Sequence, residues 1–229
     1  GYANGRLSFA VDLAPGASWH ACLLYDLEDD GERLRAPIGC IGTAQESVAG
    51  RELQAWHDAA TKLEASNSGT GRVWRQAVAD MAALCMPVDD QLIPAAGLPW
   101  FMAIFGRDSL IVSLQTLLLA PTFAHGALAV LGARQSDVLD PERDAEPGKI
   151  LHELRRGELA HFKLIPHTPY FGTADATPLY IVLLHQTWRW TGEQALLERH
   201  LKTAERCLAW IDEYGDRDGD GFQEYATRS

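Results

Sequence analysis

The sequence has few cysteines and no closely spaced cysteine pair. Its 229 residues contain four, at Cys22, Cys40, Cys85 and Cys207, and none belongs to a CxxC motif. A zinc module needs closely spaced ligands, and a disulfide scaffold is usually a small, cysteine-rich chain, so the pattern argues against both. We expect Cys85 and Cys207, which fall on apolar faces of predicted helices, to be buried thiols.

Long apolar runs are also lacking. The most apolar stretch, Leu110–Ala120, is short and contains Ser113, Gln115 and Thr116, so we expect no membrane span. The first residues lack the charged segment and apolar core of a secretory signal, which favours a cytoplasmic location. Because no initiator methionine is present, we expect the chain to begin within a longer gene product or after tag residues.

Basic residues are outnumbered by acidic ones, 20 to 31, which gives a net charge of −11. An acidic chain without a basic run does not attract nucleic acid or anionic lipid through bulk electrostatics, so we expect neither as a partner. With 47% hydrophobic and 22% charged residues, the composition is typical of a globular protein with a sizeable core.

Residues 1–46 have a β-like pattern. Leu7–Leu13 and Trp19–Leu27 are apolar runs of strand length, and the turn signal Ala14–Ala17 between them predicts a hairpin. Two strands are not stable alone in water. We therefore interpret residues 1–46 as the last strands of a β-domain whose beginning is missing.

Helical patterns dominate the rest of the chain. Residues 47–66 predict a helix and Ser66–Gly71 a flexible segment, so we assign 47–71 to a helical linker. Apolar periodicity then predicts helices at about 72–85, 108–119, 121–135, 177–191 and 193–214. In the last of these, the predicted inward face is formed by Leu197, Leu201, Ala204, Leu208 and Ile211.

Long segments at 87–106 and 136–177 separate these predicted helices. Loops of this length in compact domains are usually functional or disordered. The absence of a fixed repeat argues against TPR or HEAT arrays. A toroid of paired helices gives the same alternation of short turns and long loops, with the long loops gathered at one rim.

The first candidate site lies in the loop 94–109, where aromatic residues precede Arg107 and Asp108. Proteins commonly hold sugars with an aromatic face beside an arginine and a carboxylate that bind adjacent hydroxyls. Trp100 supplies such a face here. Alternatively, Asp108 only caps the following helix and Arg107 is solvated.

Two further clusters follow in the long loop. Residues 148–158 carry Glu153 and Arg155, which form either a wall of a cleft or a solvated surface. Residues 170–178 carry Asp175, which either points into the cleft or assists a helix cap.

Three histidines, His152, His161 and His167, lie in the same region. Their spacing matches no HExxH or facial-triad pattern, so we expect no metal site and no cofactor there.

The segment 216–224 resembles the start of an EF-hand loop. Asp216, Asp218 and Asp220 stand at positions 1, 3 and 5, and Gly221 stands at position 6. Position 12 is Thr227 instead of the bidentate glutamate that gives such loops their affinity. We favour a glycine-punctuated turn that serves a cleft over a weak calcium site.

Four segments connect the chain to a known family. FGRDSLI, PGKILHELRRGELA, YFGTADATPLYI and DRDGDGFQEY, in this order, resemble bacterial proteins of the glycogen debranching enzyme, or amylo-α-1,6-glucosidase, family. These proteins are similar to glucoamylases and trehalases in having an (α/α)6 toroid. The resemblance implies a mainly α fold in which residues 72–229 form part of such a toroid and residues 1–46 end a β-sandwich domain.

The resemblance also implies an activity, inverting hydrolysis of α-glucosidic bonds in an α-glucan or another glucoside. In this interpretation Arg107 and Asp108 grip the terminal glucose, and Trp100 is a platform at the same subsite. Glu153, Arg155 and Asp175 fall in family motifs near the rim.

Inverting hydrolysis needs a general acid and a general base. The resemblance places both beyond Ser229, so the catalytic residues are unknown and we expect the isolated chain to be inactive. The alternative is a carbohydrate-binding or regulatory half-toroid without catalysis. A toroid cut near its middle exposes an apolar helical flank, so self-association is also expected.

Overall fold

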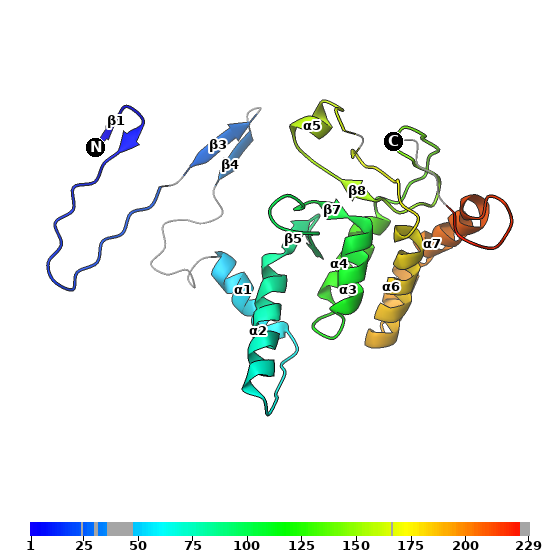
Figure 1. Ribbon diagram of the computed structural model, residues 1–229, viewed down its shortest axis with the longest axis horizontal. Helices are drawn as coiled ribbons and strands as arrows, with labels where there is room; N and C mark the ends of the chain where they lie inside the picture. Colours follow the sequence, from blue (N-terminus) through cyan, green and yellow to red (C-terminus); the bar gives the residue numbers. More distant parts are fainter. Residues whose placement is uncertain (24, 30–31, 36–47, 166, 225–229) are drawn as a thin grey trace. The chain divides into compact units, whose positions relative to one another are not determined.

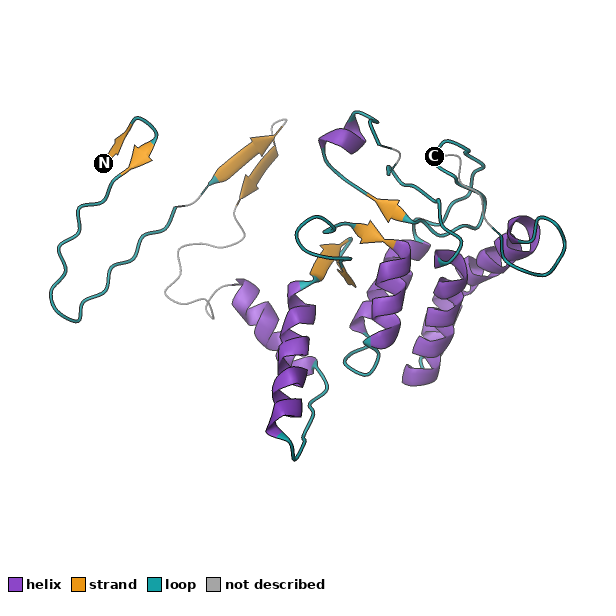
Figure 2. Cartoon of the chain, viewed as in Figure 1, coloured by secondary structure: helices purple, strands orange, loops and turns teal. Residues whose placement is uncertain are grey.

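The computed structural model of the chain is mainly helical, as predicted (Figure 2), and describes residues 1–23, 25–29, 32–35, 48–165 and 167–224. Backbone contacts divide the chain into two units, Gly1–Ala55 and Trp56–Ser229. Cys40, Thr227 and the predicted helix start at residue 47 lie outside the described residues.

The first unit contains two short antiparallel ribbons. In one, β1 (Tyr2–Ala3) pairs with β2 (Arg6–Leu7), and in the other β3 (Asp26–Asp29) pairs with β4 (Glu32–Arg35). The predicted hairpin between Leu7–Leu13 and Trp19–Leu27 is wrong.

The reason is that no layer covers these apolar runs. Residues 8–23 contain no strand, and none of this unit's side chains that the structure describes is buried. A strand is stabilised by packing one face against a partner layer, which these residues do not find here. The assignment of residues 1–46 to a β-domain stays a prediction.

Helix α1 (Val48–Ala59) contains the boundary between the units, and α2 (Ser68–Ala83) follows it. The predicted helix over 47–66 is therefore too long. The predicted flexible segment Ser66–Gly71 instead begins α2, because the Asn67 side chain accepts a 2.7 Å hydrogen bond from the Gly69 N–H.

A small apolar cluster joins these helices. Ala60, Val78 and Leu119 are buried, and Trp56 and Trp74 pack against them. The Trp56 indole also donates a 2.9 Å hydrogen bond to the carbonyl of Val78.

A hairpin occupies part of the predicted loop 87–106. Strands β5 (Cys85–Val88) and β6 (Gln91–Pro94) are antiparallel, and the Asp89–Asp90 turn between them has positive φ at both residues. Cys85 therefore lies in a strand, half-buried, and its burial raises the thiol pKa to about 11.

The main core lies among four helices, of which α3, α4 and α6 run side by side in Figure 1. They are α3 (Gly106–Gln115), α4 (Thr122–Gly132), α6 (Ala176–Thr191) and α7 (Gln194–Trp210), with a π-helical turn at Ile211–Gly215. Their fully buried side chains include Leu110, Phe123, Leu128, Leu131, Tyr180, Leu183, Leu196 and Cys207. Cys207 is thus the buried thiol that the sequence predicts.

The buried face of α7 differs from the predicted one. Leu196, His200, Ala204, Cys207 and Trp210 are the buried residues of this helix. Two leucines predicted to point inward are instead 55% and 50% exposed, Leu201 and Leu208. Self-association through such an exposed flank stays a prediction.

The segment 136–177 forms irregular structure with two short elements, as its length suggests. Strand β8 (Glu153–Leu154) pairs with β7 (Ile104–Phe105), and α5 is a single turn (Glu158–His161). Within the described ranges, no helix combines the length and apolar character needed to cross a membrane.

Candidate functional site

Two short strands and two helix starts bring the predicted site residues to one end of the helical core. Strand β7 leads directly into α3, which carries Arg107 and Asp108 in its first turn. Strand β8 carries Glu153 beside Phe105 in the ribbon. Asp175 lies immediately before α6, which packs beside α3.

Gly106 makes this arrangement possible. Its N–H donates a 2.8 Å hydrogen bond to the carbonyl of His152. A Cβ at this position would overlap the carbonyl oxygen of Leu151, so only glycine allows the start of α3 to lie against the 150–153 segment. This explains the glycine of the FGRDSLI motif in physical terms.

Arg107, Asp108 and Asp175 form the first half of the site, named here the aspartate grip. The Arg107 guanidinium lies 3.4 Å from a carboxylate oxygen of Asp175 and 3.8 Å from one of Asp108. All three side chains are partly exposed, so the ion pairs add little to stability and remain accessible to a ligand.

The structure excludes the capping alternative for both aspartates, and their role in a sugar site stays a prediction. The N-cap of α3 is Phe105, so Asp108 lies within the first helical turn and does not cap the helix. Asp175 occupies the N-cap position of α6 but makes no capping hydrogen bond with its side chain. Its carboxylate instead accepts a hydrogen bond from the Thr173 hydroxyl and pairs with Arg107.

Glu153, Arg155 and His167 form the second half of the site. The Glu153 carboxylate is buried, so a solvated surface does not describe this residue. One of its oxygens pairs with Arg155, and the other lies 3.5 Å from Nε2 of His167. Partners of this kind offset the free-energy cost of burying a carboxyl group.

Arg155 also stacks on aromatic rings. Its guanidinium lies 5.7 Å from the ring centres of Phe101 and Phe105, and its Nη1 donates a 3.2 Å hydrogen bond to the Trp100 carbonyl. Glu153 thus fixes Arg155 against the two phenyl rings.

His152 lies between the two halves. Burial is the main cause that lowers its pKa, and the charge of Arg107 lowers it further, while Glu153, Asp175 and Asp108 oppose the shift. Within the described structure, its Nδ1 atom is buried and has no hydrogen-bond partner. The imidazole is therefore neutral near pH 7 and senses the charges of both halves.

Trp100 lies apart from the aspartate grip. It is 77% exposed and lines a cavity of about 380 Å³, named here the Trp100 cavity. Arg155 and Arg156 also line this cavity, whereas Arg107, Asp108 and Asp175 do not. The structure thus joins the six predicted residues into two neighbouring places rather than one subsite.

A buried charged network holds the segment that leads into the site. Lys149 Nζ lies 3.4 Å from the Glu146 carboxylate, which also accepts a 2.8 Å hydrogen bond from the Trp210 indole. Burial lowers the pKa of Lys149, and Glu146 opposes that shift. Arg217 pairs with the same carboxylate at 3.1 Å and so connects the segment to the 216–224 loop.

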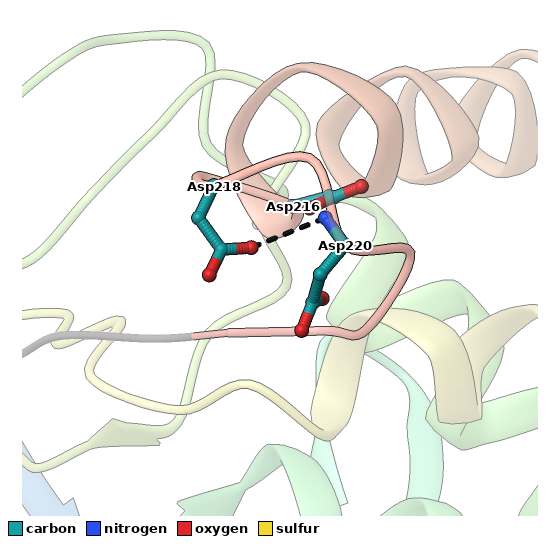
Figure 3. Close-up of side chains that lie close together, drawn as sticks. All are labelled: Asp216, Asp218 and Asp220. Carbon is teal, nitrogen blue, oxygen red and sulfur yellow. Dashed lines mark hydrogen bonds between the residues drawn. The ribbon is translucent and has the colours of Figure 1, made fainter.

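The aspartates of that loop lie close together (Figure 3), and one oxygen from each lies within 4.8 Å of those of the other two. Their carboxylates accept backbone hydrogen bonds, as when Asp216 binds the N–H groups of Gly219 and Gly221 at 2.8 and 3.0 Å. Asp218 accepts likewise from the N–H of Asp220 at 3.1 Å. These bonds give the carboxylates a role in the turn itself, and the calcium alternative stays a prediction.

Comparison with known proteins gives no further information. No family model matches the chain, and no curated protein matches its sequence.

Sequence reasoning missed the part that His152 and His167 play, since it considered them only as metal ligands. His152 directly precedes β8, a strand of only two residues (Glu153–Leu154), so no strand-length pattern in the sequence marked it. That strand became recognisable only through its pairing with β7.

Proposed function

We propose that the chain belongs to a glycoside hydrolase that acts on α-glucosidic bonds by inversion, in the manner of an amylo-α-1,6-glucosidase. In this proposal the helical unit is part of an (α/α)6 toroid. The aspartate grip binds the terminal glucose of an α-glucan or another glucoside. The observation that carries the proposal is the convergence of Arg107, Asp108 and Asp175 at the starts of two adjacent helices.

The chemistry of the aspartate grip suits vicinal hydroxyls. A carboxylate accepts from one hydroxyl while a guanidinium donates to the next, and both bonds are charge-assisted. Arg107 is held between two carboxylates, which restricts its rotamers before a ligand arrives. Such preorganisation reduces the entropy lost on binding.

The carboxylates of the site are already engaged as acceptors. Asp108 and Asp175 lie beside Arg107, and Glu153 lies between Arg155 and His167, so each carboxylate is oriented by a neighbouring side chain. This pattern also favours the second candidate function, a carbohydrate-binding module without catalysis.

The test is calorimetric titration of the chain with isomaltose. We expect Asp108→Asn to weaken binding by about tenfold or more, because it removes a charged acceptor from a hydroxyl. The fold should survive, with the free energy of unfolding changed by about 1 kcal/mol or less. Asp140→Asn is the control, because it removes the carboxylate of another aspartate–arginine pair, with Arg143 at 2.7 Å, elsewhere in the same unit.

Isomaltose binding that is equally strong in the Asp108→Asn variant contradicts the proposed role of the aspartate grip. Glucose release separates the two candidate functions. Because the isolated chain is expected to be inactive under both candidate functions, this test uses the longer gene product. Hydrolysis of isomaltose by that protein supports the enzyme, and binding without hydrolysis supports the binding module.

A further inference from the structure

The Trp100 cavity combines apolar walls with two guanidinium groups. Met86 and Val88 of strand β5, with Trp100 and Met102 of the following loop, supply the apolar part. Arg155 and Arg156 line the same space of about 380 Å³. That volume accommodates a small polar molecule that lays an apolar face on the indole.

The charges around the cavity leave one cation unmatched. Arg155 is paired with Glu153, and Asp89 at the cavity edge is paired with Arg134 at 2.5 Å. The exposed Arg156 side chain makes neither an ion pair nor a hydrogen bond within the part of the chain that the structure describes. The sum of these groups is therefore one positive charge, in a chain whose net charge is −11.

The cavity and the aspartate grip are neighbours on one segment. Ile104 lines the cavity, and Arg107 lies three residues later, at most about 10 Å along the backbone. Phe105 lies between these two residues in the sequence, and the Arg155 guanidinium stacks on its ring. A ligand larger than one sugar that is held at the aspartate grip can thus extend into the cavity.

We infer that the Trp100 cavity binds an anionic group, a carboxylate or a phosphate, on the aglycone of an α-glucoside whose glucose occupies the aspartate grip. The inference rests on the proposed function for the glucose position. The planar guanidinium of Arg156 matches both anions by paired hydrogen bonds, and the indole of Trp100 covers the apolar face of the aglycone. Because the whole chain is acidic, general electrostatics oppose anion binding, and any gain comes from the local guanidinium groups.

The experiment uses two matched pairs of ligands in calorimetric titrations of the 229-residue chain. Isomaltitol and isomaltobionate differ only in a terminal CH₂OH or carboxylate, and trehalose and trehalose 6-phosphate differ only in the phosphate. We expect at least one anionic member to bind about tenfold more tightly than its neutral partner, and this gain to shrink at high salt. The pair that shows the gain identifies the anion as carboxylate or phosphate.

Arg156→Gln should abolish the gain, because it weakens binding of the anionic ligand far more than binding of its neutral partner. Arg189→Gln, which removes an exposed arginine from α6, should preserve the gain and serves as the matched control. Equal affinity for the neutral and anionic members overturns the inference. An equal loss of both affinities in Arg156→Gln also overturns it.

The Asp108→Asn variant separates this inference from the proposed function. Suppose that Asp108→Asn loses isomaltitol binding, but the unchanged chain binds the anionic ligands no more tightly than the neutral ones. That result overturns the anion cavity and leaves the proposed function standing. Anion binding that depends on Arg156 but not on Asp108 supports the cavity and overturns the glucose position. If none of the four ligands binds, both fail together.

Discussion

The two units of the chain treat similar apolar residues in opposite ways. In the first unit, Phe9 and Trp19 contact each other with ring centres 5.2 Å apart, yet they remain 55% and 48% exposed. In the second, Phe123 and Tyr180 are completely buried among helices. An apolar pattern therefore specifies burial only where the fold supplies a second layer to cover it.

A pair of phenylalanine substitutions gives the largest expected contrast between the units. Phe123→Ala should lower the free energy of unfolding by about 3–5 kcal/mol, because it removes a fully buried ring that packs 4.9 Å from Trp56. Phe9→Ala should change it by about 0.5 kcal/mol or less. Urea denaturation followed by far-ultraviolet circular dichroism measures both.

If the two alanine variants lose similar amounts of unfolding free energy, the contrast between the units is contradicted, because Phe9 would then be covered in solution. Phe123→Leu is the control for chemistry, because it restores most of the buried apolar volume. We expect it to recover the larger part of the Phe123→Ala loss.

Acid should affect the buried unit through His200. This ring is 5% exposed, and burial, with smaller contributions from Arg199 and His125, lowers its pKa to about 4. Because the folded pKa lies below the unfolded value near 6.5, the stabilisation is present above pH 6.5 and is lost as the pH falls toward 4. We expect a loss of up to about 3 kcal/mol across this interval.

Urea midpoints at pH 7.5 and 4.5 measure this effect. His200→Gln, whose side-chain amide can still hydrogen-bond the Tyr180 hydroxyl that lies 2.9 Å from His200 Nδ1, should reduce the drop. His20→Gln in the first unit changes an exposed histidine and should keep the wild-type drop. An unchanged drop in His200→Gln would show that other groups cause the acid sensitivity.

The helices of the second unit were predictable because their apolar spacing is local information. Helices α4 and α6 lie within three residues of their predicted bounds. The buried face of α7 was not predictable, since apolar residues occur on two faces and only packing decides between them. The β5–β6 hairpin was missed because its strands have four residues each and its turn is Asp89–Asp90, without the Asn-Gly or Asp-Gly signal.

The candidate site, like the fold, could be predicted only where the information is local in the sequence. The sequence predicted Arg107 and Asp108 as a pair and placed Asp175 only near the same rim, whereas the ion pairs bring all three together. The separate position of Trp100 and the role of His152 depend on the pairing of β7 with β8, which joins residues about fifty positions apart. Contacts of that range follow from topology and cannot be read from local patterns.

Two helical glycines of the second unit allow the same comparison, because one is covered by a neighbouring strand and the other is not. Gly126 lies in α4, where a Cβ would overlap the carbonyl oxygen of Leu92 in β6, so the strand packs directly on the helix backbone. Gly71 lies in α2, and a Cβ there meets only the flexible end of Arg75 at 3.4 Å.

We expect Gly126→Ala to lower the free energy of unfolding by about 1–3 kcal/mol through overpacking, although alanine favours a helix. Gly71→Ala should raise it by about 0.5–1 kcal/mol, because the helical preference of alanine then acts alone. Urea denaturation of both variants decides the matter: opposite signs support the packing of β6 on α4, and a stabilising Gly126→Ala shows that the hairpin does not lie against the helix.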